Sequence, residues 1–407
     1  MSIFIPGSWG AQIFTLDPET IYPLSENPRS TVYTGRVLHE SHDGWVCCKT
    51  VSLGEEESPH SIRKEARLLA NVSHPNIISL LTSTYTVSPP SITLFLPLLE
   101  TPLSLILDSP SFKPDEADFI GQALSIGWQC VSAVEGLHER RIAHRDIKVE
   151  NFGRQPDGTV KLFDLGIAWE ESGPSIPGER VEESKEALIS QVGSGEYRAP
   201  ELLFSPQKYD PFALDAWSLG VVLAHFFTPL IRPRPLLSTT SSKSSSDASG
   251  DDDDDDDDDM DYLSTSSSQI ESDDEDDAED DDEENGKNWR RKSLFVSDRG
   301  EIGLAASIFR ILGTPTDELW PDFHLFPDSS KLSFLPSPGP LPSLQELLPN
   351  LPPIEPLRAE WIELLGGFLR LDPIRRTMPR EALSFKVFDS IASFLPVSYP
   401  GATLSRS

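Results

Sequence analysis

The segment from His144 to Asn151 concentrates polar side chains that suit chemistry on a phosphate group. The carboxylate of Asp146 can accept a hydrogen bond from a hydroxyl group, and the ammonium of Lys148 can reach toward a phosphate. Asn151 and, thirteen residues later, Asp164 offer the hard oxygen ligands that Mg²⁺ prefers. Phosphoryl transfer needs an aimed nucleophile, clamped phosphates and neutralising metal ions, so these residue types favour that reaction.

The order of the motifs resembles that of eukaryotic Ser/Thr protein kinases. The pattern His-Arg-Asp-x-Lys-x-x-Asn is followed by Asp-x-Gly at Asp164 and by Tyr-Arg-Ala-Pro-Glu at 197–201. The resemblance implies that Asp146 aims the attacking hydroxyl, that Lys148 contacts the transferring phosphate of ATP, and that Asn151 and Asp164 hold Mg²⁺. The alternative is that all of them are solvated loop residues, which would leave their shared order unexplained.

Five further residues are implied to hold the nucleotide. Lys49 ends an apolar run, and by resemblance it contacts the α- and β-phosphates of ATP and pairs with Glu65. Taken alone, each of these two residues could equally be a surface charge. Val32 would cover the adenine, the carbonyl of Pro97 would accept from it, and the N–H of Leu99 would donate to it.

The elements that must position these side chains fall into a β-rich part and a helical part. Strands are predicted over 31–38, 44–53 and 91–98, and helices over 62–72 and 117–138. The resemblance implies an α+β, two-lobed kinase fold over residues 22–394. Its N-lobe (about 22–98) is small and β-rich with one helix, its C-lobe (about 99–394) is larger and helical, and residues 395–407 form a tail.

The net charge of −32 is concentrated in one segment of the chain. Between residues 238 and 286 there are 23 acidic residues and one basic residue, and the segment 229–291 is predicted to be a disordered acidic insertion within the C-lobe. No basic stripe, signal peptide or membrane span is visible, and three cysteines show no disulfide or metal spacing. We therefore expect a monomer in the cytosol or nucleus, without a nucleic-acid or membrane partner.

Other motifs resemble the cyclin-dependent kinases of the CMGC group. The segment 59–65 matches the helix that carries the paired glutamate, and 309–315 reads Phe-Arg-Ile-Leu-Gly-Thr-Pro. Two features depart from that family. The positions of the usual nucleotide-covering glycines hold Ser25, Asn27 and Ser30, and Ile189 replaces the usual activating threonine. Three acids near it, Glu182, Glu183 and Glu186, either replace a phosphate charge or are simply solvated.

Together these departures resemble the single-subunit fungal kinases that activate cyclin-dependent kinases. The resemblance implies activity without an obligatory cyclin, and a substrate that is the activation-loop threonine of another cyclin-dependent kinase. Two alternatives stay open from the sequence: a kinase that requires a cyclin, and a pseudokinase scaffold without catalysis.

Overall fold

The computed structural model describes residues 15–26, 30–38, 44–54, 56–173, 183–206, 208–232, 289–331 and 339–400, together with the backbone of residues 2–3. By its contacts the chain divides into two units, residues 1–231 with 289–407, and residues 232–288. All the elements below belong to the first unit.

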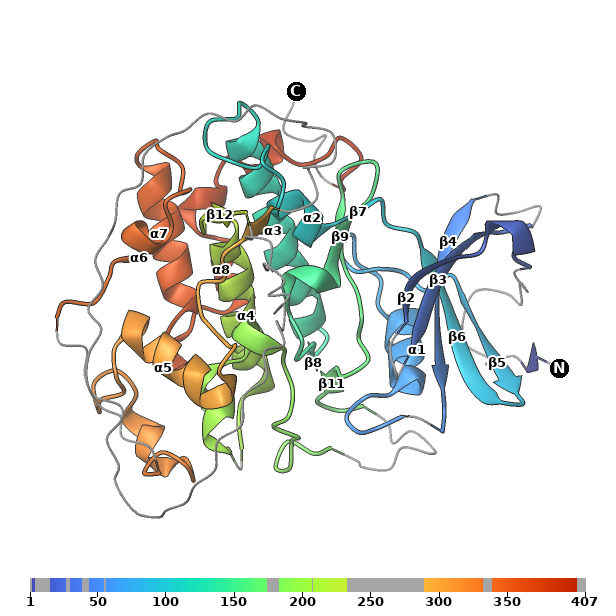
Figure 1. Cartoon of the computed structure of the whole chain (residues 1–407), viewed down its shortest axis with the longest axis horizontal. Helices are drawn as coiled ribbons and strands as arrows, with labels where there is room; N and C mark the ends of the chain where they lie inside the picture. The colour runs from blue at the N-terminus through green and yellow to red at the C-terminus, as the bar shows by residue number, and fades with distance from the viewer. Residues whose placement is uncertain are drawn as a thin grey trace, which may run out of the picture. The chain divides into compact units, whose positions relative to one another are not determined.

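A six-stranded antiparallel sheet forms the N-lobe, in the order β1-β5-β6-β4-β3-β2 (Figure 1). The strands are β1 (Ser2–Ile3), β2 (Tyr22–Glu26), β3 (Thr31–Arg36), β4 (Trp45–Ser52), β5 (Thr82–Val87) and β6 (Pro90–Pro97). Side chains alternate along β4: Val46 and Cys48 pack into one small apolar cluster, so Lys49 points to the opposite face. The register pairs Lys49 with Val32 on one side and with Leu94 on the other.

The helix α1 (Ile62–Asn71) lies beside this sheet (Figure 1). Its N-terminus is capped by Ser61, whose side chain accepts a hydrogen bond from the backbone N–H of Lys64. Ile62, Leu69 and other apolar residues of one face are buried, and the same face carries the buried carboxylate of Glu65. Because Glu65 lies on the apolar face of the helix, the packing of that face carries its carboxylate into the interior.

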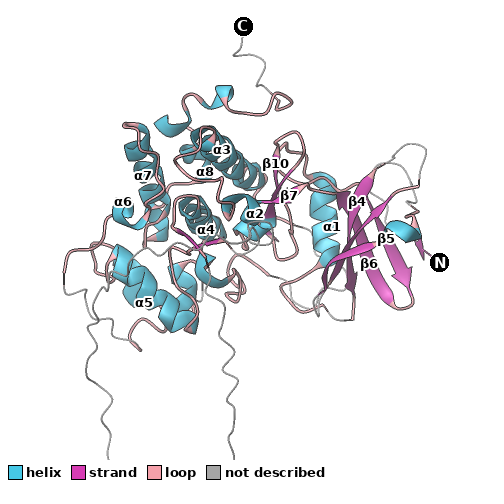
Figure 2. Cartoon of the chain, turned by 45° about the horizontal axis from the view of Figure 1, so that its top comes forward, coloured by secondary structure: helices cyan, strands magenta, loops and turns pink. Residues whose placement is uncertain are grey.

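Helices dominate the C-lobe, as the colouring of Figure 2 makes plain. They are α2 (Leu103–Leu107), α3 (Phe119–His138), α4 (Pro211–His225), α5 (Gly300–Leu312), α6 (Leu344–Leu347), α7 (Leu357–Phe368) and α8 (Pro379–Ala382). Short strands accompany them: β7 (Thr101–Pro102), β8 (Ile142–Ala143), β9 (Phe152–Arg154), β10 (Val160–Leu162) and β11 (Trp169–Glu170). The helices α3 and α4 are buried along almost their whole length, so they form the core of the C-lobe.

A two-stranded ladder lies at the ends of the predicted acidic insertion. Leu230–Ile231 (β12) pairs with Arg290–Arg291 (β13), and the guanidinium of Arg291 is buried against the carbonyls of Leu107, Phe112 and Thr228. Residues 229–232 and 289–291, at the two ends of that range, are therefore part of the described structure. Residues 233–288 lie outside the described residues, so the predicted disorder and the domain limits stay predictions.

The predicted fold class is confirmed: the structure has a β-rich N-lobe with one helix and a helical C-lobe, an α+β fold. The predicted helices 62–72 and 117–138 match α1 and α3 closely, and the three predicted strands match β3, β4 and β6. The strand β5 (Thr82–Val87) was not predicted, because four of its six residues are polar. No helix in the described part of the chain is long and apolar enough to cross a bilayer.

Candidate active site

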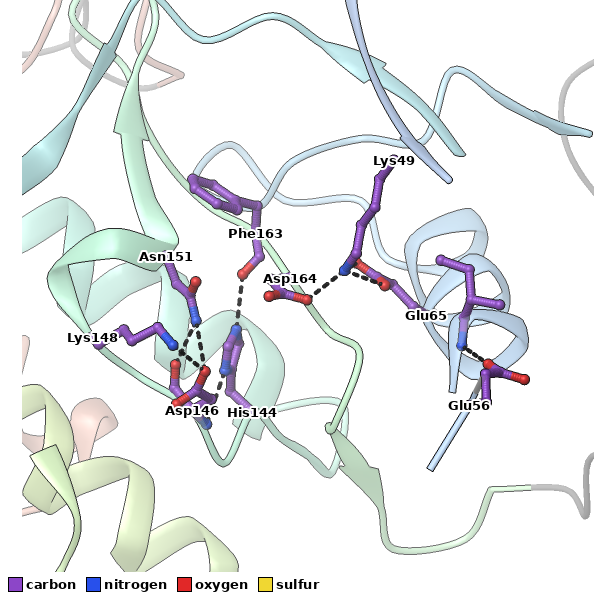
Figure 3. Close-up of polar contacts among 10 residues, drawn as sticks. Lys49, Glu56, Glu65, His144, Asp146, Lys148, Asn151, Phe163 and Asp164 are labelled. Carbon is purple, nitrogen blue, oxygen red and sulfur yellow. Dashed lines mark hydrogen bonds and ion pairs between the residues drawn. The ribbon is translucent and has the colours of Figure 1, made fainter. Parts of the chain in front are cut away.

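Three charged residues meet in one place: Lys49 of β4, Glu65 of α1 and Asp164 of the loop after β10 (Figure 3). Lys49 Nζ lies 2.8 Å from Oε2 and 3.1 Å from Oε1 of Glu65, and 2.6 Å from Oδ1 of Asp164. The sheet register and the helix face thus bring together residues that are 16 and 115 positions apart in the sequence. A side chain at Gly166 would meet this group, since an added Cβ would lie 3.2 Å from Asp164 Oδ1 and 3.8 Å from Lys49 Nζ. Glycine at this position therefore permits the close approach.

Lys49 and Asp164 stabilise each other's charge, whereas burial raises the pKa of Glu65. Burial alone would lower the pKa of Lys49, but the carboxylates of Asp164 and Glu65 outweigh burial and raise it. Burial would likewise raise the pKa of Asp164, but Lys49 reverses the effect and holds that pKa well below its usual range. Asp164 is therefore a carboxylate and Lys49 an ammonium at neutral pH.

The second group is the catalytic loop, in which Asp146, Lys148 and Asn151 converge (Figure 3). Lys148 Nζ lies 2.7 Å from Oδ2 of Asp146, and the amide nitrogen of Asn151 donates to the Asp146 carbonyl at 2.7 Å. The N–H of Phe163, the residue before Asp164, donates to the carbonyl of Asn151 at 3.0 Å, so the two groups adjoin. All five of the residues predicted to act on phosphate or metal, together with Glu65, are thereby brought near one another.

The backbone of the catalytic loop is held by Asp215 of α4. Its carboxylate accepts from the N–H groups of His144 and Arg145, both at 2.7 Å, and lies 3.0 Å from Nε2 of His138. This bracing offsets backbone strain, because Arg145 has a φ of 66°, a conformation that costs energy for a residue other than glycine. Asp215 stabilises that strained turn and so fixes the direction of Asp146.

Ser194 is a member of the site that sequence reasoning missed. Its hydroxyl donates to Oδ1 of Asp146 at 2.7 Å and accepts from Nζ of Lys148 at 2.9 Å. The adjacent Gly193 has a φ of 78°, which turns the chain so that Ser194 faces the catalytic loop. The only local signal was a serine between two glycines shortly before Tyr197, and such a pattern is too common to indicate a role.

The activation segment is anchored by an ion pair between Arg145 and Glu183. The two guanidinium nitrogens lie 2.6 and 2.7 Å from the carboxylate oxygens, and the side chains are 0% and 5% exposed. The same carboxylate accepts from the N–H of Ile189 at 2.9 Å. Burial would raise the pKa of Glu183, but the hydrogen bonds and charge of Arg145 outweigh it and lower the pKa. Of the three acids considered, Glu183 is paired, Glu186 is exposed, and Glu182 lies outside the described residues.

The helix α1 is connected to the activation segment at two further points. The backbone N–H of Ser61 donates to the carbonyl of Gly166 at 2.8 Å, and Arg67 lies 2.8 Å from a carboxylate oxygen of Glu170. With the Lys49–Glu65 pair, these contacts join the N-terminal cap and the first two turns of the helix to residues beside the active site. The chain's own contacts therefore fix the position of α1 relative to Asp164.

The residues predicted to contact adenine lie on the adjoining strands. Val32 is half-buried on β3, directly across from Lys49, and Pro97 is the last residue of β6. Leu99 follows in an extended link and packs against Gly153, where an added Cβ would clash with it. Of the residues that replace glycines, Ser25 of β2 pairs with Val32 of β3, beyond a register shift between Pro23 and Ser25. Asn27 lies outside the described residues.

The donor set fits Mg²⁺ bound together with a nucleotide. The amide nitrogen of Asn151 is turned to Asp146, which leaves its oxygen for a cation, and Asp164 is ionised. No group of three or more His, Cys, Asp or Glu side chains that could hold a metal occurs among the described residues. Two oxygen ligands completed by phosphate oxygens and water are the usual arrangement for Mg²⁺ in such sites.

Comparisons with known proteins agree with this geometry. Residues 29–275 match the model of a family described as the protein kinase domain. Probable cyclin-dependent kinase 10 of Dictyostelium discoideum is 26% identical over 84% of this chain and 71% of its own length. Cyclin-dependent kinase 7 of Carassius auratus is 26% identical over 94% and 85%, and cyclin-dependent kinase D-1 of Arabidopsis thaliana is 25% identical over 86% and 65%. The crystal structure of the yeast RNA Pol II CTD kinase CTDK-1 complex is similar in fold, with a TM-score of 0.59, 18% identity and 94% of each chain covered.

Proposed function

This chain belongs to the protein kinase family and is an ATP-dependent Ser/Thr protein kinase similar to the cyclin-dependent kinases, and on that premise we propose that it activates other cyclin-dependent kinases. In this proposal it acts as a single chain and phosphorylates the activation-loop threonine of its substrate. The observation that carries the proposal is the buried Arg145–Glu183 pair.

The pair supports activity without an activating phosphate. A phosphate on an activation segment acts by pairing with a cationic side chain and ordering the loop. In this chain Glu183 already supplies the negative charge, and its bond to the N–H of Ile189 fixes the position where a phosphorylated threonine would otherwise be expected. An ion pair encoded in the sequence is present as soon as the chain folds, so no second kinase is needed.

The contacts of α1 support activity without a cyclin. The helix must bring Glu65 to Lys49, and contacts within this chain hold it where it does so. Arg67 and the N–H of Ser61 hold the helix against the activation segment. A partner that repositions α1 would therefore add little to this site.

The site residues can carry the reaction as follows. Asp146 accepts the hydrogen bond of the attacking threonine hydroxyl and then its proton, and its direction is fixed by Ser194 and Asn151. Lys148 and Lys49 place positive charge where negative charge develops. Asn151 and Asp164 would hold Mg²⁺. When bound, Mg·ATP supplies the γ-phosphoryl group and further neutralising charge.

The test uses purified protein without cyclin. It is incubated with Mg·ATP and a catalytically inactive cyclin-dependent kinase, and phosphothreonine in the substrate's activation loop is measured by mass spectrometry. We expect one phosphate per substrate, none with the Asp146→Asn enzyme, and none on a substrate whose activation-loop threonine is alanine. Transfer to other substrates but not to this threonine would refute the proposed substrate and leave the kinase activity standing.

A second candidate is a kinase that requires a cyclin. The observation in its favour is that the three curated relatives above are all named cyclin-dependent kinases. Activity that appears only after a cyclin is added would favour this candidate over the first. In both cases we propose a cytosolic or nuclear location, which is consistent with three free cysteines, Cys47, Cys48 and Cys130.

A further inference from the structure

Near the end of the described residues, Tyr399 makes a buried hydrogen bond to a residue far away in the sequence. We infer that Tyr399 is a positioning residue for catalysis, which acts through Asn76 on the strand that leads to Asp164. The hydroxyl of Tyr399 donates to Oδ1 of Asn76, 323 positions away in the sequence, and the two residues are 5% and 0% exposed. This inference concerns the kinase reaction itself and does not depend on the substrate proposed above.

The side chain of Asn76 is fully used. Its amide nitrogen donates to Oε1 of Gln129 on α3 at 3.0 Å and to the carbonyl of Val160 on β10 at 2.9 Å. Its carbonyl oxygen accepts from Tyr399. Since the site is closed to water, removal of the Tyr399 hydroxyl would leave a buried acceptor without its donor, which is unfavourable. The loop 72–81 between α1 and β5 would then shift or loosen.

That loop is bonded directly to the strand that leads into the active site. The carbonyl of Asn76 accepts from the N–H of Leu162 at 2.8 Å, and the N–H of Ile78 donates to the carbonyl of Leu162 at 2.9 Å. Leu162 ends β10, two residues before Asp164. Between them, Phe163 donates its N–H to Asn151 at 3.0 Å. A displacement of Asn76 is therefore passed through a few peptide units to both proposed metal ligands.

The same loop also leads to α1. The helix ends at Asn71, and the N–H of Asn76 donates to Nδ1 of His74 at 3.1 Å. Movement of the loop would thus act on the helix that carries Glu65 as well as on Asp164. Both partners of Lys49 depend on the loop that Tyr399 holds.

The aromatic ring of Tyr399 is seated independently of its hydroxyl. It packs edge-to-face on Trp128, with centroids 5.5 Å apart, and forms a small cluster with Leu395. The neighbouring Ser398 donates to Oδ2 of Asp157 at 2.8 Å. Because these contacts remain, Tyr399→Phe should leave the segment docked and remove only the hydrogen bonds of the hydroxyl, which join it to Asn76 and to Ser132.

The test compares Tyr399→Phe with Ser398→Ala in the full chain. Ser398→Ala removes an exposed hydrogen bond of the same segment and is the matched control. For Tyr399→Phe we expect the KM for Mg·ATP to rise by about tenfold and the Mg²⁺ concentration for half-maximal rate to rise with it. A misplacement of about 1 Å can cost a factor of about 100, and the loss of one bond shifts the loop by less.

Hydrogen exchange supplies a second readout that does not use activity. We expect faster exchange in peptides covering 73–78 and 160–164 of Tyr399→Phe, and wild-type behaviour of Ser398→Ala in both assays. A lower Tm with unchanged kinetic constants at 25 °C would overturn the inference, because the bond would then be purely structural. Equal effects of both variants would also overturn it, since docking of the segment, and not the hydroxyl, would be responsible.

Discussion

Replacing Glu183 with glutamine tests how the activation segment is held in its ordered position. The substitution keeps the size of the side chain and removes its charge. Glu183 accepts two bonds from Arg145 and one from the N–H of Ile189. Glutamine has one oxygen in place of two, and its NH₂ group would face the guanidinium, so at least one of these bonds is lost.

The magnitude follows from the burial of the pair. Because the side chains are 0% and 5% exposed, Arg145 would remain charged in a place that water does not reach. Breaking a buried pair by removing one partner costs about 3–5 kcal/mol, and a hydrogen bond to a charged group about 1.5–3 kcal/mol. Since glutamine keeps part of the hydrogen bonding, we expect the free energy that favours the ordered activation segment to decrease by about 3 kcal/mol. At about 1.36 kcal/mol per factor of ten, kcat/KM falls by up to about 160-fold.

The assay measures kcat and KM for protein substrate and for ATP, together with Tm, on the purified cyclin-free enzyme. Glu186→Gln is the matched control, because Glu186 lies in the same segment and is exposed. We expect the control to behave as wild type. Treatment of the wild type with a phosphatase should leave its activity unchanged, since no phosphate is needed.

Two results would refute this reasoning. Wild-type kcat/KM in Glu183→Gln would mean that the ion pair does not order the segment for catalysis. A lower Tm with full activity of the folded protein would mean that the pair contributes only to stability.

Three further predictions concern the two groups of the active site. Lys49→Met should abolish the thermal shift that Mg·ATP produces, because it removes the phosphate contact and leaves Glu65 and Asp164 unneutralised; an unchanged shift would remove Lys49 from the nucleotide site. Ser194→Ala should lower kcat by about tenfold with little change in the KM for ATP, because the Asp146 side chain is then free to turn. Steady-state kinetics measures both constants, and a changed KM for ATP would mean that Ser194 serves the nucleotide instead. The pKa of Asp164 is depressed in the folded state, so its contribution to stability is present above the ordinary value of 3.8 and is lost as pH falls below it. The denaturant concentration at the unfolding midpoint should be measured at pH 7, 5 and 3. It should decrease more between pH 5 and pH 3 for the wild type than for Lys49→Met.

Local sequence determined much of the fold and of the catalytic loop. The pattern from His144 to Asn151 places three functional groups within eight residues, and so short a segment brings them together through its own turn. Apolar spacing likewise predicted α1 and α3 almost to the residue. These predictions succeed because residues a few positions apart interact whatever the rest of the chain does.

The tertiary structure decided every contact that depends on distant partners. The strand β5 is rich in threonine and serine and is held in the sheet by its neighbours β1 and β6, so its own residues gave no apolar signal. Among three nearby acids, only burial beside Arg145 distinguishes Glu183. The bond from Tyr399 to Asn76 joins positions 323 residues apart. Composition and spacing carry no information on such pairs, because which side chains meet, and whether water is excluded between them, is settled only when the strands and helices pack.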